Sequence, residues 1–360
     1  MSGFIIDPDI SKAKTISTEF YTNARYYEEA KEKIFARNWQ FVGSTDFLKA
    51  PGSCYPVQLL ESYLDEPLVL TRDRLGHLHC LSNVCTHRGN IIAYNACEAA
   101  ILRCKYHGRL FSLDGKMISM PEFKEVNDFP SDADNLHQLP LFQWGNFLFT
   151  CLNKQIQGDE VFRNMMNRLA WLPLNEFVFQ SELSKTYHVH SHWALYCENY
   201  LEGFHIPFVH AGLNAIMDYG QYATELYRYS NLQLGIAKDG EECFDLPSSS
   251  PDFGKNIAAY YFWVFPNMMF NFYPWGLSIN IVQPISINQT KVSFLTYIWK
   301  EEKLKRGAGS ELDKVEMEDE EVVEKVQKGV RSRFYNHGRY SVTREQGTHH
   351  FHRLIAEFMN

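Results

Sequence analysis

The sequences Cys-Thr-His-Arg-Gly at residues 85–89 and Cys-Lys-Tyr-His-Gly at residues 104–108 decide how the N-terminal part of this chain folds. Each stretch offers one thiol and one imidazole, and sixteen residues separate His87 from Cys104. Each also ends in a glycine, which lets the backbone turn tightly behind the potential ligands. These potential ligands are Cys85, His87, Cys104 and His107. The pattern predicts two loops that one metal centre holds together.

A [2Fe–2S] centre with mixed ligands requires this set of side chains, because two cysteines bind one iron and two histidines bind the other. Each loop then supplies one ligand to each iron. A zinc site uses the same residue types, but zinc fingers usually pair Cys with Cys and His with His at short spacing. A disulfide between Cys85 and Cys104 is a further alternative. The mixed loops favour the two-iron centre, which carries one electron at a time and needs an acceptor for it.

The composition is that of an ordinary globular protein of 360 residues, with 45% hydrophobic and 22% charged residues. This length predicts about two domains. The net charge of −8 and the pI near 6.0 argue against nucleic acid as a partner. The sequence contains neither a membrane-spanning apolar run nor a signal-peptide pattern, and its eight cysteines show no disulfide rhythm. We therefore expect a cytoplasmic protein that makes no use of a membrane.

Local patterns divide the chain into two parts. Strong helix formers occupy residues 24–37, and short apolar runs separated by turn signals then predict a mostly antiparallel β-domain over residues 39–153. A helix at residues 159–169 leads into a second domain. We expect its strands at residues 184–193, 222–235, 257–273 and 276–298, and its late helices at about 314–333 and 347–359.

A second group of potential ligands lies at residues 196–210. His205 follows Glu202 by three residues, so the two share a helix face. His210 would point away on a regular helix, but Pro207 disfavours helical geometry at Ile206 and is expected to break the helix there. The chain can then bring His210 beside His205. Two imidazoles and one carboxylate make the facial triad of a non-haem Fe(II) site.

The missing carboxylate is expected on the acidic helix near residues 314–333. Asp319 lies in its valine stripe, whereas the neighbouring glutamates point mostly elsewhere. Burying a carboxylate on an apolar face is costly unless a partner such as a metal compensates it. The stripe consists of Val315, Val322, Val323, Val326 and Val330. Asp319 is therefore the predicted third ligand, although a register shift of one residue would select Glu318 or Glu320 instead.

Both groups together resemble the α subunit of Rieske non-haem iron oxygenases, from Trp39 to about Phe351. The family pattern Asn-x-x-(Asp/Glu)-x-(Tyr/Phe)-His-x4-His matches at Asn199, Glu202, Phe204, His205 and His210, and Asp-x4-Glu-x2-Gln-x-Gly matches at Asp319, Glu324, Gln327 and Gly329. The resemblance implies an α+β fold, with an antiparallel β Rieske domain and a START-like (helix-grip) catalytic domain that has an antiparallel sheet and a long C-terminal helix. The implied boundaries are 1–38 for an N-terminal helical segment packing on the catalytic domain, 39–153 for the Rieske domain and 154–360 for the catalytic mononuclear-iron domain.

The resemblance also implies the chemistry. One [2Fe–2S] cluster at Cys85, His87, Cys104 and His107 and one Fe(II) at His205, His210 and Asp319 would form a terminal oxygenase, a mono- or dioxygenase that uses O2. Glu202 and Asn199 are the implied catalytic residues, with Glu202 bridging the two centres in a homotrimer. Many family members carry Asp at the position of Glu202, so the electron-transfer geometry is in question. The chain lacks a flavin or nicotinamide fingerprint, which makes a flavin-dependent NAD(P)H reductase or a ferredoxin the implied partner.

The aromatic segment 260–276 bears on the small organic substrate. Its Asn-Phe-Tyr-Pro-Trp-Gly wording resembles the choline, glycine-betaine and carnitine monooxygenase branch, and aromatic rings can enclose a quaternary ammonium group. An arene pocket, and hence an aromatic-ring dihydroxylating dioxygenase, is the direct rival, while plain core packing is the structural alternative. The predicted pocket residues are Phe204, Trp263, Phe272 and Trp275.

A non-enzyme remains a further alternative, namely a Rieske electron carrier fused to a ligand-binding module. It would hold about two irons per chain, whereas the oxygenase would hold about three. His188, His190 and His192 alternate along one predicted strand and so share a face that could bind a metal, but an exposed strand face is the expected interpretation.

Overall fold

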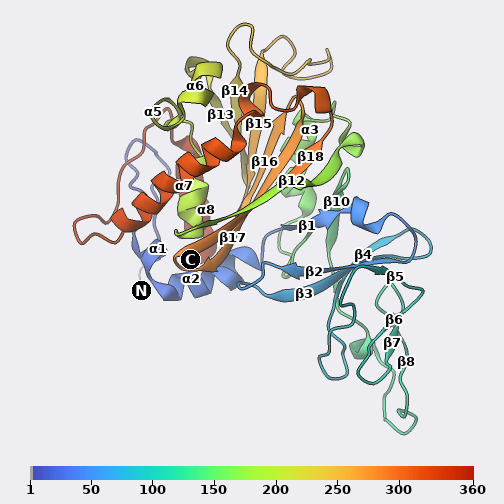
Figure 1. Cartoon of the computed structure of the whole chain (residues 1–360). Coiled ribbons are helices and arrows are strands. Elements are labelled where there is room, and N and C mark those ends of the chain that lie inside the picture. The colour runs from blue at the N-terminus through green and yellow to red at the C-terminus, as the bar shows by residue number, and fades with distance from the viewer. Residues whose placement is uncertain (1–2) are drawn as a thin grey trace. The chain divides into compact units, whose positions relative to one another are not determined.

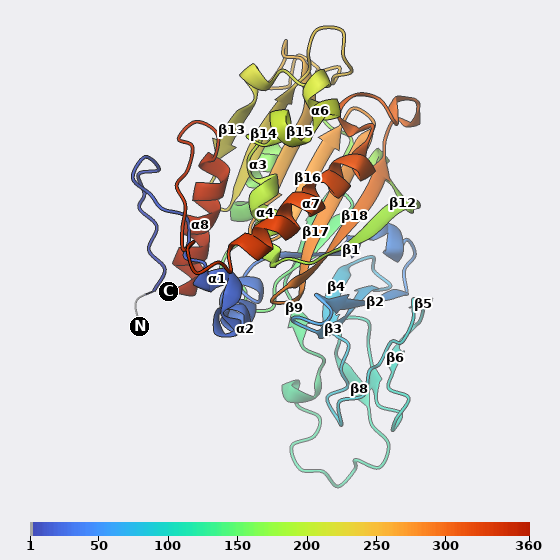
Figure 2. The same ribbon diagram turned by 60° about the vertical axis from the view of Figure 1, so that its left-hand side comes forward.

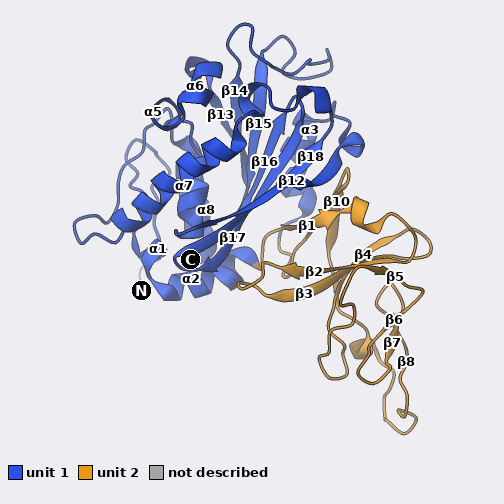
Figure 3. Ribbon diagram, in the orientation of Figure 1, with its two compact units in different colours: residues 1–35, 156–360 blue, residues 36–155 orange. Residues whose placement is uncertain are grey.

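The computed structural model describes residues 3–360, and the contacts divide the chain into two compact units (Figure 3). Unit 1 combines residues 1–35 with residues 156–360, and unit 2 consists of residues 36–155. These boundaries lie close to the sequence-based ones, and the N-terminal segment belongs to the unit that contains residues 156–360. None of the helices within residues 3–360 has the length and apolar character needed to cross a membrane.

Unit 2 is built from short antiparallel strands in three sheets. One sheet has the order β1-β11-β10, a second β5-β2-β3-β4-β9 and a third β6-β7-β8 (Figure 1). The strands are β1 (Gln40–Ser44), β2 (Ser53–Leu59), β3 (Glu66–Arg72), β4 (Leu78–Ser82), β5 (Cys97–Glu98), β6 (Leu102–Arg103), β7 (Leu110–Phe111), β8 (Met117–Ser119), β9 (Gln138–Leu139), β10 (Leu141–Trp144) and β11 (Phe147–Thr150). The two loops with mixed Cys and His lie after β4 and after β6.

Unit 1 is built around a seven-stranded antiparallel sheet of order β12-β18-β17-β16-β15-β14-β13. The strands are β12 (Val178–Val189), β13 (Ala223–Leu226), β14 (Ser230–Ile236), β15 (Ile257–Val264), β16 (Met268–Tyr273), β17 (Gly276–Ser286) and β18 (Gln289–Ile298). The helices are α1 (Glu19–Thr22), α2 (Ala24–Ala30), α3 (Gly158–Arg168), α4 (Trp193–Tyr200), α5 (Ile206–Val209), α6 (Ala211–Ile216), α7 (Leu312–Gly329) and α8 (Gln346–Met359). The predicted α+β class with antiparallel sheets is confirmed.

Helices cover both faces of this sheet. On one face Trp263 of β15 packs edge-on against Phe351 of α8, with the ring centroids 5.1 Å apart. On the other face Tyr260 donates to Asp252, which Arg168 at the end of α3 also binds. Figure 2 shows α4, α7 and α8 together on the first face, with α7 running across the strands. The alternation of side chains along the strands therefore decides which residues can reach α4 and α7.

Three local predictions are corrected. Residues 24–37 were expected as one helix, but α2 ends at Ala30 and a π-helix follows at Lys31–Phe35. Pro207 lies in the first turn of α5, where proline is favoured because its missing N–H has no intrahelical partner to lose, so it begins a helix rather than breaking one. The third correction concerns α7. Its buried residues are Glu316, Val323 and Gln327, whereas Val326 is exposed, so the inward stripe is more polar than the valines suggested.

Candidate metal centres

The two loops of unit 2 have the same backbone turn. In the first, the amide of Cys85 donates to the Asn90 carbonyl at 2.8 Å and the amide of Gly89 donates to the Cys85 carbonyl at 3.0 Å. In the second, Cys104 donates to Arg109 at 2.9 Å and Gly108 donates to Cys104 at 3.0 Å. Gly89 and Gly108 have φ of +71° and +76°, a conformation that a side chain disfavours. Each turn therefore satisfies its own backbone and presents its Cys and His on one side.

The side chains of the loops fit a two-iron cluster. The thiols of Cys85 and Cys104 are buried and free, and the rings of His87 and His107 lie 4.8 Å apart between centroids. Burial alone would raise the pKa of the Cys104 thiol, but the backbone amide of Tyr106 and the Cys85 thiol outweigh it and lower that pKa. The Asn90 amide also lies 3.7 Å from the Cys104 sulfur. A thiolate surrounded by N–H donors, as at Cys104, is suited to bind iron, whereas burial raises the pKa of the Cys85 thiol.

A buried arginine that the sequence reasoning missed ties the first loop to a distant segment. Arg109 is 2% exposed, and its guanidinium donates to the Thr86 hydroxyl at 2.6 Å and to the Asp134 carboxylate at 2.9 Å. Thr86 in turn donates to the Asp134 carbonyl at 2.7 Å. Arg109 follows directly after the second motif in the sequence, and this position alone could have indicated that Arg109 supports the cluster loops.

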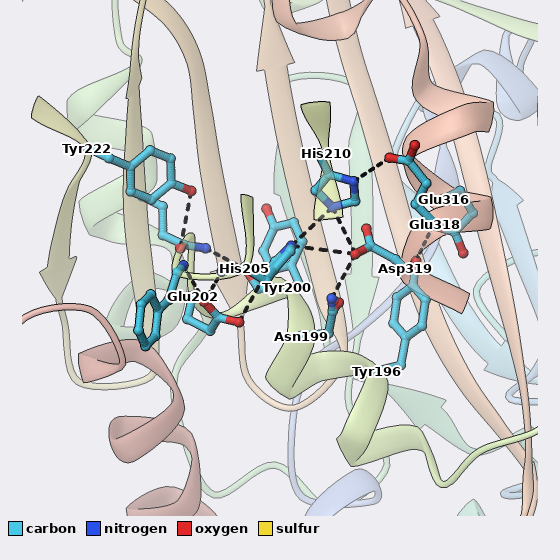
Figure 4. A network of polar contacts seen from close by, with 12 residues as sticks. Tyr196, Asn199, Tyr200, Glu202, His205, His210, Tyr222, Glu316, Glu318 and Asp319 are labelled. Atoms are coloured by element: carbon cyan, nitrogen blue, oxygen red, sulfur yellow. Dashed lines mark hydrogen bonds and ion pairs between the residues drawn. The ribbon is translucent and has the colours of Figure 1, made fainter. Parts of the chain in front are cut away.

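The second group of ligands converges in unit 1 (Figure 4). The Nε2 atoms of His205 and His210 lie 3.1 Å apart, and the Asp319 Oδ1 lies 3.5 Å and 3.0 Å from them, respectively. These three side chains form a group of potential metal ligands whose atoms all lie within 4.8 Å of one another. His205 and His210 flank α5, and Asp319 comes from α7. The structure thus brings together the three residues that the sequence predicted as ligands.

The hydrogen bonds around these histidines orient them for a cation. The Nδ1 of His205 contacts Glu202 Oε1 at 2.8 Å, and the Nδ1 of His210 contacts Glu318 Oε2 at 2.8 Å. When each Nδ1 donates to its carboxylate, both Nε2 lone pairs and the Asp319 oxygen face the same point. Three acceptors facing one another repel, and a divalent cation removes that repulsion. The donor set therefore fits a 2-His-1-carboxylate iron site.

The two neighbouring carboxylates also change the pKa of His210. Burial would lower the pKa of His210, but Asp319 and Glu318 raise it. Positive charge is thus favoured at this point of the structure.

Two further predicted residues surround the site. Asn199, in the last turn of α4, donates its amide to Asp319 Oδ1 at 2.8 Å and so fixes that carboxylate. Glu202 accepts from the backbone amides of Phe204 and His205, the latter at 3.1 Å, in addition to its contact with the His205 ring. From the sequence, we expected the side chain of Glu318 to point away from the site. Instead, Glu318 contacts Nδ1 of His210, the ring nitrogen on the side opposite Asp319.

A cavity of about 110 Å³ adjoins the three ligands. Its lining is rich in tyrosine and comes from α4 to α6, the strands β14 to β18, α7 and the segments that connect them. Besides the three ligands, it includes Tyr196, Tyr200, Tyr222, Tyr261, Tyr273, Asn271, Phe294 and Glu316.

The predicted pocket residues are corrected, because Phe204, Trp263, Phe272 and Trp275 do not belong to this lining. Phe272 has the opposite strand parity to Asn271 and Tyr273 and faces away. Trp263 shares the face of Tyr261 but packs against α8, and Trp275 stacks behind Tyr273 at 5.2 Å. Phe204 is exposed beside Phe208.

Comparisons with known proteins identify both units. A family model for the Rieske [2Fe–2S] domain matches residues 38–130, and a model for the ring hydroxylating alpha subunit (catalytic domain) matches residues 179–360. Chloroplastic choline monooxygenase of Arabidopsis thaliana is 30% identical over 97% of this chain and 84% of its own length. The carnitine monooxygenase oxygenase subunit of Escherichia coli (strain K12) is 28% identical over 96% of this chain and 94% of its own length.

Solved structures share the fold. A quaternary ammonium Rieske monooxygenase in complex with L-carnitine aligns with a TM-score of 0.77 and 23% identity over 98% of this chain and 97% of that chain. Naphthalene 1,2-dioxygenase from Rhodococcus sp. aligns with a TM-score of 0.75 and 15% identity over 96% of this chain and 94% of that chain. These findings set aside the zinc, disulfide and electron-carrier alternatives. The chain belongs to the Rieske non-haem iron oxygenases, as an α subunit whose cofactors are one [2Fe–2S] cluster and one mononuclear iron.

Proposed function

We propose that this chain is the terminal oxygenase of a multi-component monooxygenase that hydroxylates or N-demethylates a quaternary ammonium compound. His205, His210 and Asp319 would hold the iron, and their ligand atoms lie within 4.8 Å of one another. Cys85, His87, Cys104 and His107 would hold the cluster. When bound, the cluster supplies one-electron transfer and the iron supplies activation of O2.

The protein's own residues position these groups. Glu202 and Glu318 hold the two imidazoles in the tautomer that leaves each Nε2 free, since each contacts the Nδ1 of its histidine at 2.8 Å. Asn199 fixes the Asp319 carboxylate at 2.8 Å. Glu202 also forms the link toward the cluster of a neighbouring subunit in a homotrimer. Its extra methylene relative to Asp places its carboxylate further from the backbone.

The single observation that carries the substrate class is the cavity beside the ligands. It presents five tyrosine side chains and the carboxylate of Glu316 to its contents. Tyrosine faces attract an ammonium ion by cation–π interaction, which supports a quaternary ammonium substrate over an arene. The kinship with choline and carnitine monooxygenases supports the same choice. A separate NAD(P)H-dependent flavin reductase or a ferredoxin supplies the electrons, and a cytoplasmic location is proposed.

Oxygen uptake by the reconstituted enzyme tests this proposal. With a reductase and NAD(P)H, we expect uptake to rise on adding choline or another trimethylammonium compound, and the oxidised product to appear in mass spectra. Naphthalene should give no product. Metal analysis should find about three irons per chain, with the electron paramagnetic resonance signal of a reduced Rieske cluster. Dihydroxylation of an arene without turnover of any ammonium compound would contradict the proposed substrate class.

A further inference from the structure

Glu316 is a buried acid in the cavity to which the binding of iron assigns no role. It lies on α7, three residues before Asp319, so both side chains leave the same face of the helix and line the same cavity (Figure 4). The residue is 3% exposed. A carboxyl group in this position loses its hydration when the protein folds, and such a loss is costly unless a partner compensates it.

Only half of this carboxyl group has a partner in the protein. Its Oε2 accepts from the Tyr196 hydroxyl at 2.6 Å, whereas its Oε1 is buried without a hydrogen bond. Glu316 therefore needs only Oε2 to join α4 to α7, and this structural role does not explain why Oε1 is buried. Burial, together with the nearby Asp319 and Glu320, also raises the pKa of Glu316 well above its ordinary value despite the Tyr196 contact. A cation beside Oε1 would compensate this cost.

The remaining lining fits the same ligand. Tyr261 and Tyr273 form an edge-on pair with centroids 5.9 Å apart, and Tyr200 directs its hydroxyl to Asn271 at 2.8 Å. Tyr222 donates to Gln233 at 3.2 Å. With their hydroxyl groups engaged, Tyr200 and Tyr222 are left with ring surfaces and edges to offer to a ligand. Several aromatic rings and a carboxylate that line one cavity form a site suited to a large, weakly hydrated cation.

The charges in the lining also bear on what else the ligand carries. Among the residues that the structure describes, the ionisable groups in the lining are carboxylates, imidazoles and tyrosines, with neither lysine nor arginine. Apart from the iron that Asp319 would help to hold, a substrate carboxylate would find no cationic side chain in the lining to pair with it and would face Glu316. Like charges at short range in a buried site repel strongly. The lining favours a simple cation over a zwitterion.

We propose that Glu316 is the counter-ion of the substrate's quaternary ammonium group and that the preferred substrate is a cation without a carboxylate, such as an amino alcohol of the choline type. This inference rests on the proposed function and adds to it the residue that recognises the charge. Because Glu316 and Asp319 are one helical turn apart, the recognised ammonium group lies close to the iron ligands.

Anaerobic calorimetry on the iron-loaded enzyme tests the proposal. The ligands are choline and 3,3-dimethylbutan-1-ol, in which carbon replaces the charged nitrogen at the same shape. We expect the unmodified enzyme to bind choline about tenfold or more tightly than the neutral compound. Glu316→Gln should lose that preference by weakening choline binding while leaving the neutral compound unchanged. The amide can still accept from Tyr196. Glu321→Gln, which removes one negative charge at an exposed position of α7, should bind both ligands as before.

Each outcome separates the inference from the proposed function. If Glu316→Gln binds choline as tightly as the unmodified enzyme does, the role of Glu316 is refuted while the proposed function stands. If L-carnitine or glycine betaine binds as tightly as choline, the preference for a simple cation is refuted. If the unmodified enzyme prefers the neutral compound or naphthalene, the proposed substrate class itself fails. Should Glu316→Gln not fold, Glu316→Asp keeps the charge and is expected to retain the preference for choline.

Discussion

The two candidate metal centres are assembled in different ways. In unit 2 both loops lie within residues 85–109, and each closes its own turn with a pair of backbone hydrogen bonds. In unit 1 the ligands come from residues 205–210 and from α7, more than about 100 residues later in the chain. The cluster loops are thus organised locally, whereas the mononuclear site exists only when α7 packs against α4 and α5. Contacts of long sequence separation depend on the whole core of the unit.

Removing a ligand gives the largest expected effect and tests whether the two centres are independent. His210→Ala should reduce the iron content from about three to about two per chain and abolish oxygenation, since the site loses one of its three protein ligands. The visible and electron paramagnetic resonance signals of the cluster should persist. Cys104→Ala should eliminate the cluster signals and leave the mononuclear iron in place. Loss of both centres in either variant would show that they are not built independently.

Arg109→Ala should destabilise unit 2 by about 3 kcal/mol, because it removes the charged partner of the partly buried Asp134 carboxylate and one hydrogen bond of Thr86. The measurement is the midpoint at which the cluster absorption bleaches during thermal or denaturant unfolding. Arg103→Ala, at an exposed position just before the second motif, is the matched control and should change the midpoint little. An unchanged midpoint in Arg109→Ala would mean that the loops alone hold the cluster.

Glu318→Gln should weaken iron binding in unit 1 by about 10- to 100-fold, because the carboxylate that holds His210 Nδ1 becomes a neutral amide. Competition with a chelator measures this affinity. Glu321→Gln on the exposed side of the same helix should leave the affinity as it is. If both variants bind iron equally tightly, Glu318 does not contribute to the iron site.

The smallest effect concerns the acid sensitivity of unit 1. His192 caps α4 and is fully buried, and burial lowers its pKa from 6.5 to about 3. The unfolded chain binds a proton on this residue below about pH 6.5 while the folded chain does not, so stability falls as the pH falls from about 6.5 toward about 3. The slope is at most about 1.4 kcal/mol per pH unit.

The variant His192→Asn keeps an acceptor for the cap and should flatten this slope, measured from denaturant midpoints between about pH 6.5 and 5. The exposed His188→Asn should preserve it. An unchanged slope in His192→Asn would show that other groups cause the acid sensitivity.

The same contrast explains what the sequence could predict. Asp319 was selected because it lies on the inward face of α7, and it does, although the buried residues of that face are Glu316, Val323 and Gln327 rather than the whole valine stripe. The cofactors followed from the residues and their order along the chain. The residues that line the substrate cavity could not be predicted in this way, because a strand residue reaches the cavity only if it lies on the correct face of the sheet and at the correct position along the strand. Trp263 and Tyr261 share a face, yet only Tyr261 reaches the cavity.

The roles of Glu318 and Arg109 could not be predicted because each depends on a contact across the fold. Nothing in the local sequence around Glu318 distinguishes it from the other acids of α7. Its contact with His210 Nδ1 requires the relative placement of α5 and α7. Arg109 likewise pairs with Asp134, a residue of a separate loop.

Adjacent residues of α7 contact opposite sides of one imidazole: Glu318 meets Nδ1 of His210 and Asp319 meets Nε2. Neighbours on a helix project about 100° apart, so the ring is held from two directions by a single rigid rod. A small rotation of that rod about its axis cannot leave both contacts unchanged. The tilt of the imidazole therefore depends on how α7 is rotated about its axis.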